Sequence, residues 1–258
     1  MYRFGLFKPK FYVGLLNYVG VPTIIIYFVF MCVVPWFYGD WDYVHGVWLD
    51  WQTLNTGVLA FLSSITAFNI SSVAVEKQRQ RDFVASRALL PQKLDDLCQY
   101  LSESATSLQG AYYHSRNRSE MSEMSEITVP KLSDAHFQTF QECIRHATPE
   151  VGDYLAKVLN MLQVHGARLE GVCKNPRTNR RYYNTLFFGL AELKVSVDDL
   201  FPLARGEEDN ISGKVDKESI SRALHILGIY YENTENLESY VNEQVGKISH
   251  NKAFKSDS

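Results

Sequence analysis

Hydrophobic and polar positions divide this chain into two unlike parts. Two long uncharged runs lie within the first 75 residues, and the remaining chain is charged and has helical periodicity. The most apolar part of the first run covers residues 21–38, and the second run covers residues 51–75. A helix of about 20 apolar residues crosses the hydrocarbon core of a bilayer. The pattern therefore predicts two transmembrane helices, joined by an outer loop at residues 39–50.

A cleaved signal peptide is the alternative explanation for the first run. Its apolar region would be about 7–15 residues long and would end in small residues at a cleavage site. Here the uncharged run covers residues 11–39, and its apolar part ends with Pro35 and Trp36. We therefore interpret it as a retained span, preceded by a cytoplasmic or interfacial segment at residues 1–20, with a bend at residues 20–22.

Small and hydroxyl-bearing residues concentrate in the second run. At about 100° per residue they share one face of a helix, and such a face allows close approach of another helix in a membrane. The candidate packing or pore residues are Asn55, Thr56, Ala60, Ser63, Ser64, Thr66, Ala67 and Ser71. Two explanations stay open: packing of this face against the first span, or self-association that lines a water-filled path. Ser and Thr hydroxyls can also bond their own helix backbone, which favours the first.

Basic residues flank both apolar runs. Arg3, Lys8 and Lys10 precede the first run, whereas the loop at residues 39–50 contains three aspartates and no Lys or Arg. The membrane-proximal basic residues after the second run are Lys77, Arg79, Arg81 and Arg87. Under the positive-inside rule, this distribution predicts that both termini are cytoplasmic. The same residues would also attract anionic lipid.

The chain beyond residue 75 has the pattern of successive amphipathic helices, and no stretch alternates as a half-buried strand would. Capping side chains predict helix starts at Ser133, Thr148, Asp216 and Thr234. Pro91 is expected to kink or restart the helix that leaves the membrane. The predicted segments are a membrane-proximal helix at 76–113, a linker at 114–130, a cytoplasmic helical domain at 131–250 and a tail at 251–258. The expected fold class is all-α: a two-helix transmembrane hairpin followed by a cytoplasmic helical bundle.

A net charge of −3 argues against a chain that coats nucleic acid. A local basic cluster nevertheless surrounds a helix break, next to Tyr182 and Tyr183. Its residues, candidates for contact with an acidic partner or nucleic acid, are Arg168, Lys174, Arg177, Arg180 and Arg181. A solvated helix end is the alternative, because cations are favourable near a helix C-terminus. The four cysteines are widely spaced, which predicts free thiols in a reducing cytosol.

Catalytic and cofactor motifs do not occur in the sequence, which has no phosphate-binding loop, HExxH or GxSxG pattern. Cys143 and His146 share a helical turn without two further ligands nearby, so a zinc site is not expected. For the loop at residues 209–213, Ile220 occupies the position where a calcium loop requires glutamate. We therefore predict no enzyme activity, and no catalytic residue, metal, cofactor or small-molecule substrate.

One part of the sequence resembles a known class of protein. The similarity covers roughly residues 20–110, through residues 51–54, the second apolar run and its exit at Arg81, and the motifs at residues 86–91 and 94–100. In this arrangement the chain resembles small bacterial membrane proteins with two spans and a helical cytoplasmic part. It is similar to the membrane effectors of retron anti-phage systems.

That resemblance implies an inner-membrane effector of abortive infection, held silent by a complex of a reverse transcriptase and its DNA or RNA product. Release of the effector would disrupt the membrane. The expected partners are the lipid bilayer, further copies of the chain as a homo-oligomer, and the inhibitory complex. The alternative is a membrane-anchored scaffold or sensor without pore activity. Leucine at Ala60 and Ala67 distinguishes the two, because only the effector depends on close approach of its spans.

Overall fold

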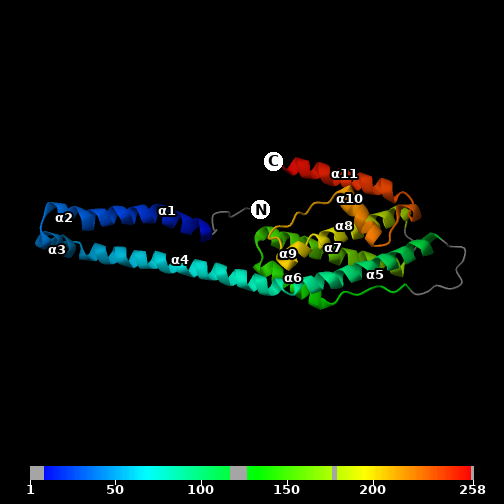
Figure 1. The fold of residues 1–258 in the computed structure, drawn as a ribbon, viewed down its shortest axis with the longest axis horizontal. Coiled ribbons are helices and arrows are strands. Elements are labelled where there is room, and N and C mark those ends of the chain that lie inside the picture. Colours follow the sequence, from blue (N-terminus) through cyan, green and yellow to red (C-terminus); the bar gives the residue numbers. More distant parts are fainter. Residues whose placement is uncertain (1–8, 117–126, 176–178, 257–258) are drawn as a thin grey trace. The chain divides into compact units, whose positions relative to one another are not determined.

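The computed structural model describes residues 9–116, 127–175 and 179–256 (Figure 1). Over these residues the secondary structure is helical and contains no strand, which confirms the predicted all-α class. The chain forms two compact units, Met1–Gln78 and Arg79–Ser258. The boundary falls inside one long helix, so a continuous helical backbone leads from the first unit into the second.

The first unit is built on two apolar helical stretches. Its elements are α1 (Pro9–Phe28), the π-helical η1 (Val29–Val33), α2 (Val34–Tyr38), α3 (Trp41–Asp50) and α4 (Gln52–Arg87), which continues into the second unit. The stretches Tyr18–Tyr38 and Gln52–Arg87 are long and apolar enough to span a membrane, with mean hydropathies of 2.1 and 1.8. Only 12% and 0% of their most apolar windows are buried, whereas the core helix of a soluble protein is mostly buried.

Two details of this unit differ from the expectations. Residues 20–22, expected to separate an interfacial segment from the first span, lie inside one helix, because α1 continues through Pro22. A proline removes one helical hydrogen bond, but its fixed φ is compatible with a helix. Residues 39–50, expected as a loop, contain α3, in which Val44, Val47 and Trp48 have the spacing of one apolar helix side.

The second unit is a helical bundle in which α8 packs against α5, α7, α10 and α11 (Figure 1). Its helices are α5 (Leu90–Arg116), α6 (Asp134–His146), α7 (Pro149–Lys174), α8 (Arg180–Asp198), α9 (Phe201–Arg205), α10 (Lys217–Ile226), the 3-10 helix η2 (Tyr231–Asn233) and α11 (Leu237–Ser256). The predicted inner faces are confirmed: Leu94 and Leu101 of α5 and Leu155 and Val158 of α7 are completely buried. Each such side chain stabilises the fold by about 2 kcal/mol through removal of apolar area from water.

Three predicted helix starts are confirmed in this unit. The Ser133 side chain accepts a hydrogen bond from the backbone N–H of Ala135 at the start of α6. Thr148 immediately precedes α7, whose first residue is a proline. Asp216 and Ser219 form a reciprocal capping box at α10, with N···O distances of 2.9 and 3.1 Å. The Ser133 and Asp216 caps satisfy N–H groups that the first turn of a helix leaves unpaired, whereas the Thr148 side chain makes no cap hydrogen bond.

The boundaries near the C-terminus differ from the prediction. The helix that Asp216 starts ends at Ile226, close to Gly228, which adopts a left-handed φ of 72°. Thr234 does not cap the last helix, which begins three residues later at Leu237. Between them Asn236 has a φ of 60°, a conformation that does not continue a right-handed helix.

The predicted membrane-proximal helix at residues 76–113 consists of two helices. The first, α4, ends at Arg87, and α5 begins at Leu90 with Pro91 in its first turn, which confirms the predicted restart. From there α5 extends to Arg116, into the expected linker at residues 114–130. Residues 117–126 of that linker lie outside the described part of the chain.

His165 is a buried histidine in the interior of the second unit. It lies on α7 with its ring edge-on to Tyr100 of α5, at a centroid distance of 6.2 Å. Its Nε2 atom has no hydrogen-bond partner within the described residues. Desolvation by burial, with a smaller contribution from the charge of Arg168, lowers the pKa of His165 to about 4 from 6.5. The folded chain therefore holds this ring neutral.

We expect the second unit to lose stability as the pH falls from about 6.5 toward about 4. In this range the unfolded chain binds a proton at His165 and the folded chain does not, so the free energy of unfolding decreases. The full effect is on the order of 3 kcal/mol, and His165→Leu should remove it. Denaturant unfolding of the chain in detergent, followed by circular dichroism at both ends of the range, measures the difference. An unchanged pH dependence in His165→Leu would contradict this assignment.

Candidate functional site

The helix α4 has one face that is buried or half-buried along its whole length. We call this the packed face. Its positions alternate spacings of three and four residues: Asn55, Val58, Leu62, Ile65, Asn69, Ser72, Glu76, Arg79, Phe83 and Ser86. This heptad spacing keeps one stripe of a helix against neighbouring helices. The packed face is therefore the side of α4 that other parts of the same chain cover.

In the first unit, α1 and α3 cover the packed face at its N-terminal end. The hydroxyl of Tyr27 donates a hydrogen bond to the Asn55 side-chain oxygen. The Asn55 amide in turn donates to the backbone carbonyl of Trp48, at 3.3 Å. Further along, Gly20 of α1 lies so close to Ile65 that an added Cβ would be 3.4 Å from its Cδ1. The first apolar helix thus packs through Asn55 and Ile65.

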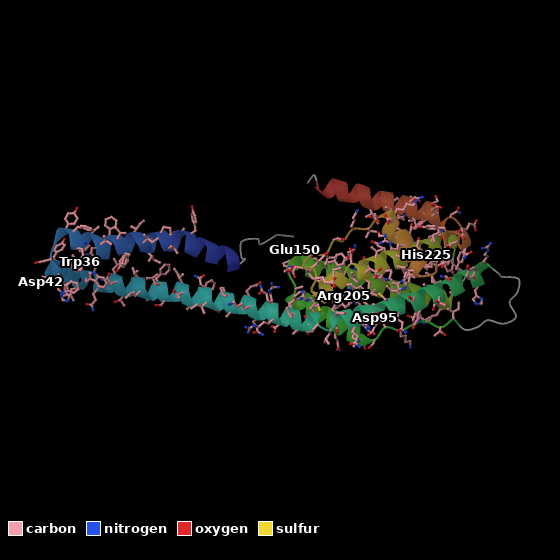
Figure 2. All side chains as sticks on the ribbon, in the orientation of Figure 1. Trp36, Asp42, Asp95, Glu150, Arg205 and His225 are labelled. Carbon is pink, nitrogen blue, oxygen red and sulfur yellow. The ribbon has the colours of Figure 1, made fainter. Side chains whose placement is uncertain are left out.

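A second polar contact holds α3 to the irregular part of the first helix. Pro35 has no N–H and cannot donate to the carbonyl of Met31, which lies one helical turn earlier. The indole Nε1–H of Trp48 donates to that carbonyl at 3.0 Å. Figure 2 shows Trp36 of α2 and Asp42 of α3 at this end of the hairpin. The polar groups here are therefore paired within the first unit.

The opposite face of α4 is exposed and consists largely of small residues. We call it the small-residue stripe. Its exposed positions also alternate spacings of three and four: Thr53, Gly57, Ala60, Ser64, Ala67, Ser71, Ala74, Gln78, Arg81 and Ala85. At about 100° per residue it lies roughly opposite the packed face. Since α1 occupies the packed face, the stripe is not covered by the first apolar helix.

The structure divides the predicted packing or pore residues between these faces. Four of them belong to the small-residue stripe: Ala60, Ser64, Ala67 and Ser71. Thr56, Ser63 and Thr66 are exposed outside it. Asn55 must be reassigned, because it is 8% exposed and lies on the packed face with Tyr27 and Trp48.

The hydroxyls near the stripe bond to their own helix. Each of these hydroxyls donates a hydrogen bond of 2.9 Å to the backbone carbonyl four residues earlier. The residues are Thr56, Ser63, Ser64 and Thr66. A hydroxyl paired in this way needs neither water nor a neighbouring helix. The exposed surface of α4 is consequently compatible with lipid, and the small side chains of the stripe leave room beside the helix backbone.

The four membrane-proximal basic residues have different surroundings. Lys77 and Arg81 are exposed. Arg79 is half-buried and donates from Nη1 to the backbone carbonyls of His146 and Ala147, at 2.6 and 2.8 Å. The sequence contains no sign of this second role, because the acceptors are backbone atoms some 67 residues away.

Arg87 completes this basic set at the end of α4. Its guanidinium lies 5.7 Å from the ring centroid of Phe83, a cation–π arrangement, and 3.9 Å from Asp209. Asp209 is almost fully exposed, so the ion pair contributes little stability. Its guanidinium also lies close to Gly206, where an added Cβ would be 2.9 Å from Nη2, so Arg87 lies against the segment that follows α9.

The predicted basic cluster at the α7–α8 break is partly neutralised. Lys174 pairs with Glu170 at 2.6 Å, and this hydrogen bond is the main cause of a lowered pKa at Glu170. Arg168 and Arg181 are exposed. For Arg180 the structure describes only the backbone, which begins α8, and Arg177 lies outside the described residues.

The described cysteines are free, as predicted: Cys143 is buried, and Cys98 and Cys173 are half-buried. Burial raises the pKa of all three thiols, which keeps them protonated and unreactive. Within the described part of the chain, no three His, Cys, Asp or Glu side chains form a group that could hold a metal ion.

The geometry defines an all-α protein with two helices apolar enough to span a membrane and a separate helical unit. Comparisons with protein-family models, curated proteins and solved structures find no match to this chain. The features of this chain that bear on its function are the two faces of α4 and the residues around them.

We expect Asn55→Leu to destabilise the first unit by about 1–3 kcal/mol, because the Tyr27 hydroxyl loses its acceptor and the Trp48 carbonyl its donor. All four tryptophans of the chain, Trp36, Trp41, Trp48 and Trp51, lie at this end of the hairpin. Thermal unfolding in detergent, followed by tryptophan fluorescence, therefore reports on this unit.

The control for this substitution is Thr56→Val, which removes a hydroxyl bonded only within α4. It should leave the fluorescence transition in place. Equal transitions for Asn55→Leu and Thr56→Val would show that Asn55 does not hold the hairpin.

Proposed function

We propose that this chain is a two-pass inner-membrane protein whose second span self-associates through the small-residue stripe, and that the assembled spans disrupt the membrane. The apolar surface of the first unit supports the membrane location. Phe30, Leu59 and Ile70 are 64%, 63% and 65% exposed, and they belong to a much larger set of exposed apolar side chains. A soluble monomer rarely exposes so much apolar area. A lipid bilayer is an environment in which this apolar area can be exposed without contact with water.

The proposed topology places both termini in the cytoplasm. Asp40, Asp42 and Asp50 lie between the two apolar stretches, together with exposed tryptophans, and basic residues are absent there. Lys77 and Arg81 are exposed beyond the second stretch. This distribution follows the positive-inside rule and the preference of tryptophan for the membrane interface.

The observation that carries the proposal is the exposure of a regular small-residue stripe on the side of α4 that α1 leaves uncovered. Between helices in lipid there is no hydrophobic driving force, so close backbone packing at small residues stabilises association. A second α4 offers the same stripe with the same spacing, which suits a symmetric contact. Assembly of several hairpins in this way would disturb the bilayer around them.

The similarity to retron membrane effectors gives the proposed activity a biological setting. In that setting the chain acts in abortive infection, and a reverse transcriptase with its nucleic-acid product holds it silent. Exposed Arg168 and Arg181 are the described members of the basic cluster that would meet such an acidic partner. Pairing of Lys174 with Glu170 leaves fewer cations for that contact.

A second candidate function is a membrane-anchored scaffold or sensor. The hydroxyl bonds of Ser63, Ser64 and Thr66 to their own helix favour it, because these groups are then not committed to lining water. In this case the stripe would serve association alone, without loss of membrane integrity.

Ala60→Leu combined with Ala67→Leu should weaken self-association at least about tenfold, because two added isobutyl groups separate the helix backbones. Energy transfer between labelled copies in lipid vesicles measures the association. The matched control is Ile70→Phe with Val73→Phe, which adds bulk to exposed positions of α4 outside the stripe. If energy transfer were as strong in the leucine variant as in the unmodified chain, the stripe would be excluded as the interface. The same conclusion would follow if the phenylalanine control weakened energy transfer.

Expression of the chain alone in a bacterial cell should depolarise the inner membrane and admit dye, and a truncated chain that begins at Arg87 should not. The leucine variant should also lose this effect. An intact membrane with normal energy transfer would instead support the scaffold, because the chain would then associate without disrupting the bilayer.

A further inference from the structure

The helix α3 has two unlike sides, a difference that a connecting loop does not need. Trp41, Val44 and Trp48 recur at spacings of three and four residues, so they share one side of the helix. At about 100° per residue, Asp42 and Asp50 lie on the other side. Helices that lie along a membrane surface have this separation of apolar and charged sides.

The rest of the hairpin covers only part of the apolar side of α3. Val44 is buried, and α3 contacts α2 and η1. Trp48 is anchored by its indole N–H, which donates to the Met31 carbonyl at 3.0 Å, but the residue is still 45% exposed. Because that N–H is already paired, the exposed ring of Trp48 offers water no hydrogen-bond donor. Its exposed area is therefore apolar.

Trp41 extends this apolar side toward the first apolar helix. It is 65% exposed, and its ring centroid lies 5.8 Å from that of Trp36 of α2, which is also exposed. We call Trp36, Trp41 and Trp48 the aromatic surface. Phe37 and Tyr38, next to Trp36 in α2, are even more exposed than the tryptophans. The closed end of the hairpin thus exposes large aromatic side chains from two helices.

Continuity with the apolar helices indicates what covers the aromatic surface. Trp36 belongs to the stretch Tyr18–Tyr38, whose most apolar window is only 12% buried within the chain. Tryptophan is enriched where the hydrocarbon of a bilayer meets the headgroups, because its ring is large and apolar and its edge is polar. Asp42 and Asp50, on the other side of α3, require water. A bilayer interface supplies both surroundings across the width of one helix.

We propose that α3 is an interfacial helix: its aromatic surface binds the headgroup region of a phospholipid bilayer, and Asp42 and Asp50 face the water. Attraction to anionic headgroups does not contribute, because residues 39–50 contain no Lys or Arg. This inference rests on the proposed membrane location and is independent of self-association through the stripe. In this arrangement α3 fixes the depth at which the hairpin lies in the bilayer.

Tryptophan fluorescence of the full chain in phosphatidylcholine vesicles tests the depth of this end. All four tryptophans lie within residues 36–51, so the emission reports on the closed end of the hairpin alone. Lipids brominated near the headgroup end of their chains should quench it at least about twofold more than lipids brominated near the methyl end. Acrylamide, which quenches from water, should act at least about twofold less than on the chain in denaturant.

Cysteine labelling distinguishes the two sides of α3. Trp41 and Asp42 are both exposed within one copy of the chain, so cysteines at these positions differ in access to water only if something else covers one of them. In vesicles, an uncharged polyethylene-glycol maleimide should label Trp41→Cys at least about tenfold more slowly than Asp42→Cys, because the reactive thiolate is disfavoured out of water. Each rate is divided by the rate in denaturant, and the unmodified chain gives the background of the native cysteines.

These measurements distinguish the possible failures. Equal labelling of Trp41→Cys and Asp42→Cys in the vesicle-bound chain would place both sides of α3 in water and overturn the proposal. Slow labelling of Trp41→Cys that becomes fast when the chain is diluted in lipid would show that a second copy covers the aromatic surface, and would also overturn it. A chain that does not float with the vesicles would refute the proposed membrane location, and the interfacial helix with it. The expected labelling in a chain whose copies do not associate would support the interfacial helix and refute only the proposed assembly.

Discussion

The rest of the structure depends on the continuity of α4. A single helix without internal proline cannot change the relation between its two sides, so one stripe stays packed and the opposite stripe stays exposed from Gln52 to Arg87. Close to the N-terminal end the packed side meets α1 at Ile65. Beyond residue 78 the same side carries Arg79 onto the carbonyls of α6.

Polar residues in the apolar unit stabilise this geometry through hydrogen bonds between its helices. Asn55 joins Tyr27 of α1 to Trp48 of α3, and Trp48 bonds the carbonyl of Met31 that Pro35 cannot. Each of these polar groups is satisfied locally, as an apolar surrounding demands. The hydroxyls near the stripe follow the same rule by bonding their own helix. The polar groups named here are thereby paired within one copy of the chain.

The second unit supplies a conventional core and one unusual connection. Leucines of α5 and α7 at heptad-like spacing form the interior with α8, and the cap of α6 comes from a distant helix through Arg79. The leucines contribute about 2 kcal/mol each to the stability of this unit.

The sequence by itself determined the all-α class, the two apolar helices, the caps at Ser133 and Asp216 and the buried leucine faces, because these depend on local spacing and on side-chain polarity. It also identified the small residues of α4. It could not determine which face of α4 is covered by α1. Polar residues, both Asn55 and the Ser and Thr hydroxyls, occur on more than one side of this helix, so polarity does not distinguish the covered face from the exposed one. Only the tertiary structure placed Asn55 on the packed face and Ala60 on the exposed one. Only the tertiary structure also identified the hydrogen-bond partners of Arg79. These are backbone carbonyls at the end of a helix far away in the sequence, and every residue has such a carbonyl, so the sequence cannot predict them.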